Sequence, residues 1–248
     1  MKGVLLCGGT GSRLGLLTTV TNKHLLPVGG EPMVCHPLRK LVGAGITDIL
    51  IVSGPEHMGG FIELLGSGKR FGCELTYRVQ EEAGGIAEAL GLAARFVGDD
   101  RVMVVLGDNI FEDPLGPVVV KAGYPDPEGD AVLVLKHVTM EQASRYGVAV
   151  FHGGKITAAI EKIVEKPQEP PSEYAVAGVY CYPPGALANI NTLTRSARGE
   201  LEITDLNNHY IEQRRVRHTF FDGYWSDAGT PESLYWANRL VMSRSPMF

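Results

Sequence analysis

The sequence has no long apolar run and no excess of basic residues. Its 23 Lys and Arg are outnumbered by 28 Asp and Glu, giving a net charge of -5. The basic surface expected of a nucleic-acid binder is therefore missing. No apolar run approaches the roughly 20 residues that span a bilayer, and the N-terminus begins with a strand-like run instead of a signal peptide. We expect a cytoplasmic protein that binds neither nucleic acid nor membrane.

Clustered metal ligands are also missing. The four cysteines lie far apart, without the short spacing of a zinc knuckle or a redox motif. No two of the seven histidines have the spacing of a helical metal pair. The sequence predicts no zinc site, and it predicts reduced, buried cysteines.

Ordinary globular composition is present, with 44% hydrophobic and 21% charged residues. In the first half, short β-branched apolar runs alternate with helical patterns. This alternation predicts a largely parallel sheet in one α/β domain. The expected strands are 3–7, 49–52, 75–79 and 102–106, and the expected helices are 33–42 and 86–94.

The second half is less regular, and no linker separates it from the first. Strands are expected at 131–135, 147–151 and 175–182, and helices at 205–212 and 231–241. Thr230 is the expected N-cap of the last helix, which has Pro231 in its first turn. Residues 165–173 contain three prolines and are predicted to form a loop.

A glycine-rich turn follows the first strand, and its exposed N–H groups could cradle phosphate oxygens. The alternative is an ordinary tight turn. A dinucleotide fingerprint would need glycine at position 14, which is Leu14, and the P-loop pattern fails as well. Arg13 and Lys23 add two cations suited to a triphosphate. The glycine-loop candidates are Gly8, Gly9, Gly11 and Ser12.

Two acidic blocks lie far apart in the chain. Asp108 follows a buried strand, at the end where open α/β sheets bind ligands. Asp227 lies in a second block, Trp225 to Thr230. Two carboxylates are a common way to hold one Mg²⁺. Either aspartate alone could instead be a helix cap or a turn residue.

Six blocks in this order resemble the sugar-1-phosphate nucleotidyltransferases, specifically the glucose-1-phosphate thymidylyltransferases. The resemblance rests on GGTGSRL at 8–14 with KHLLP at 23–27, and on QEEAGGIA, LGDN, VEKP and RGELEITD, followed by WSDAGT. It implies a Rossmann-like three-layer sandwich with a mostly parallel mixed sheet. The domain 1–248 would have a nucleotide-binding part at about 1–110 and a sugar-phosphate-binding part at about 111–230. The implied reaction joins dTTP and glucose 1-phosphate on Mg²⁺, giving dTDP-glucose and pyrophosphate.

The resemblance also implies roles for individual residues. Asp108 and Asp227 would bind Mg²⁺, with Asp108 also at the nucleotide. Arg13, Lys23 and Lys166 would be the catalytic cations. Gln80 and Gly85 would read the pyrimidine, for which an amide donor and acceptor suit thymine or uracil. The expected sugar-phosphate residues are Asn109, Gly147, Glu165, Lys166, Val176 and Glu200. Glu202 is either a sugar-site residue or a capping partner near Asp205.

The chain departs from the family pattern in a few places. About three extra residues precede the Glu-Lys-Pro triplet, so that Lys162 competes with Lys166, and only Lys166 is followed by proline. Val28 to Glu31 replaces a more usual aromatic-acidic-Lys stretch. The chain resembles the short form of the family, without the C-terminal extension of longer relatives. A homo-oligomer, by resemblance a tetramer, is expected.

Three alternatives remain open at this point. The enzyme could use UTP or another hexose 1-phosphate. The chain could be a non-catalytic regulatory relative that binds nucleotide sugar, although such a protein could lose Arg13, Lys23 or an aspartate, and all are present. A nicotinamide-binding dehydrogenase is disfavoured by Leu14.

Overall fold

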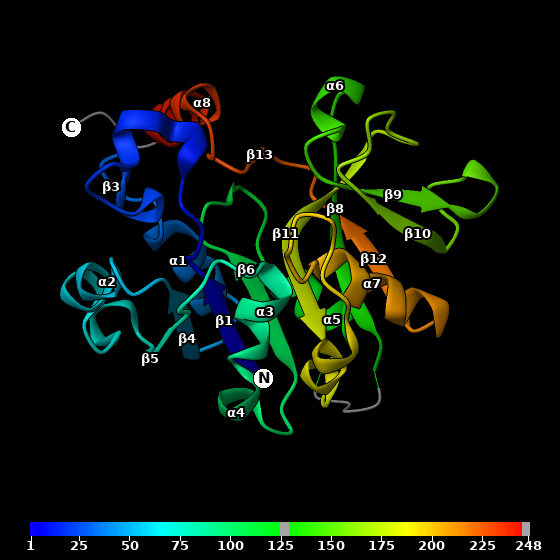
Figure 1. The fold of residues 1–248 in the computed structure, drawn as a ribbon, viewed down its shortest axis with the longest axis horizontal. Helices are drawn as coiled ribbons and strands as arrows, with labels where there is room; N and C mark the ends of the chain where they lie inside the picture. Colours follow the sequence, from blue (N-terminus) through cyan, green and yellow to red (C-terminus); the bar gives the residue numbers. More distant parts are fainter. Residues whose placement is uncertain (125–128, 245–248) are drawn as a thin grey trace.

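The fold is built on one mixed sheet of nine strands (Figure 1). A computed structural model describes residues 1–124 and 129–244. Four strands of the first half are paired in parallel, in the order β5-β4-β1-β6. Their ends lie within one residue of the predicted ranges; β1, β4 and β6 are marked by continuous apolar runs, and the edge strand β5 by alternation of apolar and polar residues. They are β1 (Lys2–Leu6), β4 (Asp48–Ser53), β5 (Glu74–Val79) and β6 (Val102–Leu106).

Helices cover both faces of this parallel part. Alternate residues of the strands point to opposite faces. Leu5 and Ile51 pack in one apolar cluster with α1 and α2, while Val4 and Leu50 pack in another with α3 and α4. The three layers agree with the predicted sandwich. The helices are α1 (Cys35–Gly43), α2 (Met58–Leu65), α3 (Ile86–Gly91) and α4 (Ala94–Val97), with 3-10 turns η1 (Ser12–Thr18), η2 (Lys23–Leu25) and η3 (Lys69–Phe71).

Two of these helices differ from the prediction. The first begins at Cys35, two residues later than expected, and the predicted helix 86–94 is divided into α3 and α4. The division follows Gly91, a residue that favours the end of a helix. Helix α2, which contains two glycines near its start, was not predicted.

The second half extends the same sheet through an antiparallel strand, β11 (Tyr174–Tyr182), which pairs with β6. The register of β11 against its other neighbour, β8 (Ala131–His137), shifts between Val176 and Tyr180. Strand β12 (Val216–Phe220) runs parallel to β8. An antiparallel hairpin of β9 (Gly147–Phe151) and β10 (Ile160–Glu165) meets β11 at one residue pair, Ala175 and Val148.

Neither β10 nor β12 was predicted. Strand β10 includes charged residues on its exposed side, and β12 is only partly buried, so neither has an apolar run. The predicted loop 165–173 is wrong at its first residue, because Glu165 ends β10; the proline-rich remainder is irregular, as expected.

The remaining elements are helices, 3-10 turns and two pairs of short strands outside the main sheet. Thr230 caps α8 as predicted, since its Oγ1 accepts a hydrogen bond from Ser233 N at 3.2 Å. No helix in the described residues is long and apolar enough to cross a membrane. The helices are α5 (Gly116–Lys121), α6 (Met140–Ala143), α7 (Ile203–Glu212) and α8 (Pro231–Arg244), with η4 (His152–Gly154) and η5 (Ala186–Thr192). The short strands form two pairs, β2 (Pro27–Val28) with β3 (Glu31–Pro32) and β7 (Ile110–Phe111) with β13 (Trp225–Ser226).

Candidate active site

A cleft of about 660 Å³ opens beyond the carboxyl ends of β1 and β6. This is the edge at which open α/β sheets bind ligands. All but one of the predicted site residues line it. The lining members are Gly8, Gly9, Ser12, Arg13, Lys23, Gln80, Gly85, Asp108, Asn109, Gly147, Glu165, Lys166, Val176, Glu200 and Asp227. Gly11 is not among the lining residues; it lies at the start of η1 with φ 65° and shapes the turn.

The two predicted metal acids are brought to one cleft by the small β7–β13 ladder. Ser226 pairs with Ile110 in this antiparallel ladder. When the same register is continued by one residue, Asp227 lies opposite Asn109. Asn109 Oδ1 accepts a hydrogen bond from Trp225 Nε1 at 2.6 Å, which ties the two acidic blocks together. The close packing also needs Gly178, where a Cβ would lie 2.8 Å from that same oxygen.

Asp108 is ionised and paired with Lys23. Lys23 Nζ donates to Asp108 Oδ2 at 2.5 Å, and Asn109 Nδ2 donates to Asp108 Oδ1 at 2.9 Å. Burial by itself would raise the pKa of Asp108, but the charge of Lys23 and these hydrogen bonds outweigh it and hold the pKa below its usual value. A buried carboxylate that stays charged is suited to bind a cation.

Asp227 is less completely satisfied. Its Oδ2 lies 3.5 Å from Arg13 Nη2, and its Oδ1 lies 3.7 Å from Arg145 Nη2. Among the described residues, both Asp227 Oδ1 and Arg145 Nη2 are buried without a hydrogen-bond partner. The backbone is also strained here, because Ala228 has φ 35°. An orphaned carboxylate oxygen at a strained position indicates a site built for a ligand that the chain itself does not supply.

Lys23 owes its position to its neighbours. Asn22 Oδ1 accepts hydrogen bonds from His24 N at 2.9 Å and from the His24 ring Nδ1 at 2.6 Å, while Asn22 Nδ2 donates to Cys7 O. Burial and the charge of Lys23 lower the pKa of His24 to about 3, so its imidazole is neutral near pH 7. This buried network fixes η2 and directs the lysine into the cleft.

Gln80 and Gly85 form one end of the cleft, in the register that the sequence predicts. Gln80 Nε2 lies 3.5 Å from Gly85 O and 3.4 Å from Glu88 Oε1. Gly85 has φ 105°, and a Cβ there would lie 2.4 Å from Leu201 O. Only glycine fits this contact, which brings the loop before α3 against the segment before α7.

Another part of the cleft lining is rich in carboxylates. Thr204 Oγ1 donates to Glu165 Oε2 at 2.5 Å, and Lys166 Nζ lies 3.1 Å from Glu165 Oε1. Arg198 lies among three acids, 3.5 Å from Glu165, 3.3 Å from Glu200 and 2.8 Å from Glu202. Glu202 is the N-cap residue of α7, but its side chain makes no capping hydrogen bond and is engaged by Arg198 instead.

The hairpin β9–β10 settles the position of the competing lysines. Glu165 pairs with Gly147, and Lys166 N donates a hydrogen bond to Tyr146 O at 3.0 Å. These contacts are at the base of the hairpin, so they do not depend on the number of residues toward its tip. The register shifts between Ile160 and Lys162, so Glu161 is one extra residue that the hairpin accommodates as a bulge. Lys166 lines the cleft with φ 41°, whereas Lys162 is exposed on β10 and does not.

Several residues of the cleft were missed from the sequence. Arg145 and Arg198 sit beside predicted acids, and each lies within three residues of a predicted site residue, which is a signal that could have marked them. Tyr146 packs edge-on against Trp225, with ring centroids 5.0 Å apart. Arg198 and Thr204 also lie in the RGELEITD block, whereas Asn207 lies just beyond it on α7.

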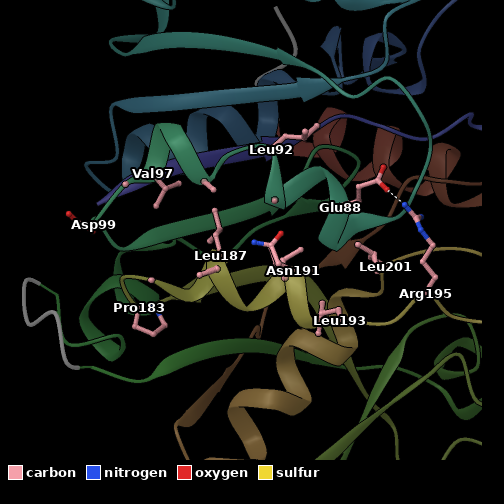
Figure 2. Close-up of a pocket in the computed structure, with 16 residues that line it drawn as sticks. Glu88, Leu92, Val97, Asp99, Pro183, Leu187, Asn191, Leu193, Arg195 and Leu201 are labelled. Atoms are coloured by element: carbon pink, nitrogen blue, oxygen red, sulfur yellow. Dashed lines mark hydrogen bonds and ion pairs between the residues drawn. The ribbon is translucent and has the colours of Figure 1, made fainter.

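A second cavity, of about 860 Å³, lies between α3–α4 and η5 (Figure 2). Leucines and alanines make up much of its lining. Its charged residues are Glu88 and Arg195, which form an ion pair at 2.6 Å, and Asp99. No set of cations converges there as in the first cleft. We therefore place the candidate active site in the cleft of Asp108 and Asp227.

The chain is similar over nearly its whole length to known proteins. It is 40% identical over 245 residues to a glucose-1-phosphate thymidylyltransferase of Neisseria meningitidis, covering 98% of this chain and 83% of the relative. It is 38% identical to Agl11 of Haloferax volcanii, a low-salt glycan biosynthesis nucleotidyltransferase, covering 98% of this chain and 66% of the relative.

Solved structures agree. A Bacillus anthracis protein, provisionally designated a glucose-1-phosphate thymidylyltransferase and crystallised with sucrose, matches with a TM-score of 0.90 at 49% identity, covering 100% of this chain and 97% of that one. A UDP-glucose pyrophosphorylase complexed with UDP-glucose matches with a TM-score of 0.85 at 21% identity over 98% of both chains, which shows a shared fold alone. The family model for the nucleotidyl transferases matches residues 2–244. The chain therefore belongs to the nucleotidyl transferase family.

Proposed function

We propose that the chain transfers the thymidylyl group of dTTP to glucose 1-phosphate, giving dTDP-glucose and pyrophosphate, with Mg²⁺ as cofactor. The observation that carries the proposal is the convergence of three cations, Arg13, Lys23 and Lys166, with two separate aspartates in one cleft. Relatives at about 40% identity that are named glucose-1-phosphate thymidylyltransferases support the choice of substrates.

The residues present fit a magnesium ion. Mg²⁺ is usually held by one or two carboxylates, with phosphate and water oxygens completing an octahedron. The cleft offers the ionised Asp108 and the orphaned Oδ1 of Asp227. The described residues contain no cluster of three or more His, Cys, Asp or Glu that could hold a metal, so substrate oxygens would supply the other ligands. When bound, the ion would neutralise phosphate charge.

The chain's own groups would position two anions. In the proposed reaction, a phosphate oxygen of the sugar phosphate forms a bond to the α-phosphorus, and the bond from that phosphorus to the pyrophosphate oxygen breaks. A phosphate monoester, with a second pKa near ~6, is largely dianionic at pH 7, so no general base is required. Lys166 would hold the attacking phosphate, while Arg13 and Lys23 would stabilise the triphosphate and the departing pyrophosphate.

Two groups of residues in the cleft would select the substrates. The Gln80 amide and the backbone at Gly85 would read the pyrimidine edge, while Glu165 and Glu200 would accept hydrogen bonds from sugar hydroxyls. Thr204 and Lys166 hold the Glu165 carboxylate in place for this purpose. Thymine and uracil offer the same hydrogen-bonding edge, so the preference for dTTP over UTP is the most detailed part of the proposal. Homo-oligomerisation and a cytoplasmic location stay predictions.

One assay tests the proposal. Glucose 1-phosphate is offered with each of dTTP, UTP, ATP and CTP, with Mg²⁺ or with EDTA, and pyrophosphate release is measured. We expect fastest release with dTTP and none in EDTA. A preference for UTP would change the nucleotide only. No release with any nucleotide or any hexose 1-phosphate, together with calorimetric binding of a nucleotide sugar, would instead identify a non-catalytic relative.

A further inference from the structure

A buried polar group at the bottom of the cleft has no partner within the described residues. Asn207, on α7, is 1% exposed and lines the cleft. Its Oδ1 accepts a hydrogen bond from the Tyr182 hydroxyl at 2.6 Å. Its Nδ2 makes no hydrogen bond. Because an unsatisfied buried donor is destabilising, such a group in a native cleft requires an explanation.

The location of Asn207 points to the sugar end. It lies one helical turn beyond Thr204, and residues three apart on a helix share a face. Thr204 is the residue that holds Glu165. A Cβ at Gly147 would lie 3.2 Å from Thr204 Oγ1, so this face of α7 directly adjoins the hairpin that carries the glutamate. Asn207 is therefore next to the proposed sugar site, one turn of α7 after Thr204.

The Asn207 amide is a neutral group whose one hydrogen bond among the described residues is to a neutral hydroxyl, that of Tyr182. Tyr182 and Ile203, one helical turn before Asn207, are buried and belong to one apolar cluster. Among the cations of the cleft, Lys166 lies against Glu165, Arg198 against three glutamates, and Arg13 against Asp227. An uncharged donor suits a hydroxyl group better than a phosphate, which needs a counter-charge.

We propose that Asn207 Nδ2 donates a hydrogen bond to one ring hydroxyl of the sugar and makes Asn207 a specificity-determining residue. The inference rests on the proposed function and refines it. When a sugar phosphate lacks that hydroxyl, the Asn207 amide has no hydrogen-bond partner in the complex. That analogue is therefore a poorer substrate than the full sugar phosphate. The discrimination against that one deoxy sugar is roughly ten- to a hundredfold in kcat/KM.

The test uses glucose 1-phosphate and its 2-, 3-, 4- and 6-deoxy analogues. Asn207→Leu alone would also leave the Tyr182 hydroxyl without its acceptor. The comparison is therefore made in a Tyr182→Phe background, where replacing both partners by apolar groups is close to neutral. Wild type, Tyr182→Phe and the double variant Tyr182→Phe/Asn207→Leu are compared for kcat/KM by pyrophosphate release and for sugar-phosphate affinity by calorimetry.

We expect wild type and Tyr182→Phe to reject the analogue that lacks the hydroxyl bound by Asn207 by ten- to a hundredfold. The double variant should lose activity on glucose 1-phosphate by a similar factor. Its kcat/KM for that analogue should then nearly equal its kcat/KM for glucose 1-phosphate, while the ratios for the other analogues stay as they are in Tyr182→Phe. Equal ratios in all three proteins would overturn the inference. So would a wild-type enzyme that rejects no analogue, or a Tyr182→Phe variant that loses discrimination as fully as the double variant. Absence of turnover in the wild type would instead count against the proposed function, and calorimetry then decides the role of Asn207.

Discussion

At the scale of single residues, the cleft is defined by charges that are only partly neutralised within the chain. Asp108 has a close lysine partner, whereas Asp227 lies between two guanidinium groups without a hydrogen bond to its Oδ1. The two aspartates are therefore not equivalent before substrate binds. Among the described residues, Asp227 has a carboxylate oxygen without a hydrogen bond, whereas both oxygens of Asp108 accept one.

The first prediction concerns these acids. Asp227→Asn and Asp108→Asn should each fold normally, because the amide keeps the shape of the side chain. Each should lose about 100-fold or more in kcat, about 3 kcal/mol of stabilisation of the transition state. Pyrophosphate release and circular dichroism check this. Asp222→Asn, an exposed acid five residues upstream, is the matched control. Near-normal Mg²⁺-dependent rates in either cleft variant would rule out this metal site.

At the scale of elements, short segments without strong sequence patterns decide the geometry. The β7–β13 ladder has two residues in each strand, yet it aligns the two acidic blocks. The loop before α3 is held by Leu201, whose N donates to Gly84 O at 2.8 Å and whose O accepts from Ala87 N at 3.1 Å. Backbone contacts of this kind do not depend on side-chain type, so they leave little trace in the sequence.

The second prediction tests that loop. Gly85→Ala would place a Cβ 2.4 Å from Leu201 O in a left-handed conformation, and neither backbone segment can yield easily. We expect a loss of about 1–3 kcal/mol in the free energy of unfolding. The KM for the nucleotide should rise, since the pyrimidine end is displaced. Urea denaturation and steady-state kinetics measure the two effects.

Gly43→Ala is the control for this loop variant. Gly43 ends α1, and a Cβ there would meet nothing within 4 Å. This change should leave KM unaltered and stabilise the protein slightly, by about 0.5–1 kcal/mol. A Gly85→Ala variant that behaved like the control would contradict the role given to the loop.

At the scale of the whole molecule, the site and the core are joined at His24. The imidazole packs beside Phe61 of α2, and Gly107, directly after β6, lies against its Cδ2, where a Cβ would be 2.8 Å away. His24 is 1% exposed, so protonating it in the folded state would place a charge in the interior. Its titration should therefore affect global stability.

The third prediction follows from that burial. Burial, with the nearby charge of Lys23, lowers the pKa of His24 from 6.5 to about 3 in the folded state. Between pH 3 and pH 6.5 the unfolded chain binds a proton at this imidazole that the folded chain does not. The stability contributed by the neutral, buried His24 is therefore fully present above pH 6.5 and is lost as pH falls toward 3. The free energy of unfolding should decrease by up to about 1.4 kcal/mol per pH unit from this group.

Urea denaturation from pH 7 to pH 4 measures the effect. His24→Gln should have a shallower dependence than wild type, because it removes the titrating imidazole. His152→Gln, which removes an imidazole that is 64% exposed, is the control. Identical slopes in wild type and His24→Gln would show that His24 does not titrate in this way.

The sequence by itself determined the parallel strands, the helices with a clear apolar face, and nearly all of the predicted site residues that line the cleft. These features are local: apolar runs, helical periodicity and short blocks of defined chemistry. It also led to Lys166 over Lys162, through the proline that follows. Strands β10 and β12 escaped detection because their stability comes from pairing and partial burial.

Only the tertiary structure decided which groups face one another. The placement of Arg145 beside Asp227, of Thr204 against Glu165, and of an unpartnered Asn207 amide in the cleft depends on segments distant in the chain. A hydrogen bond or an ion pair is fixed by distances of about 3 Å. Those distances arise when the sheet, the hairpin β9–β10 and helix α7 pack together, and no local pattern encodes them.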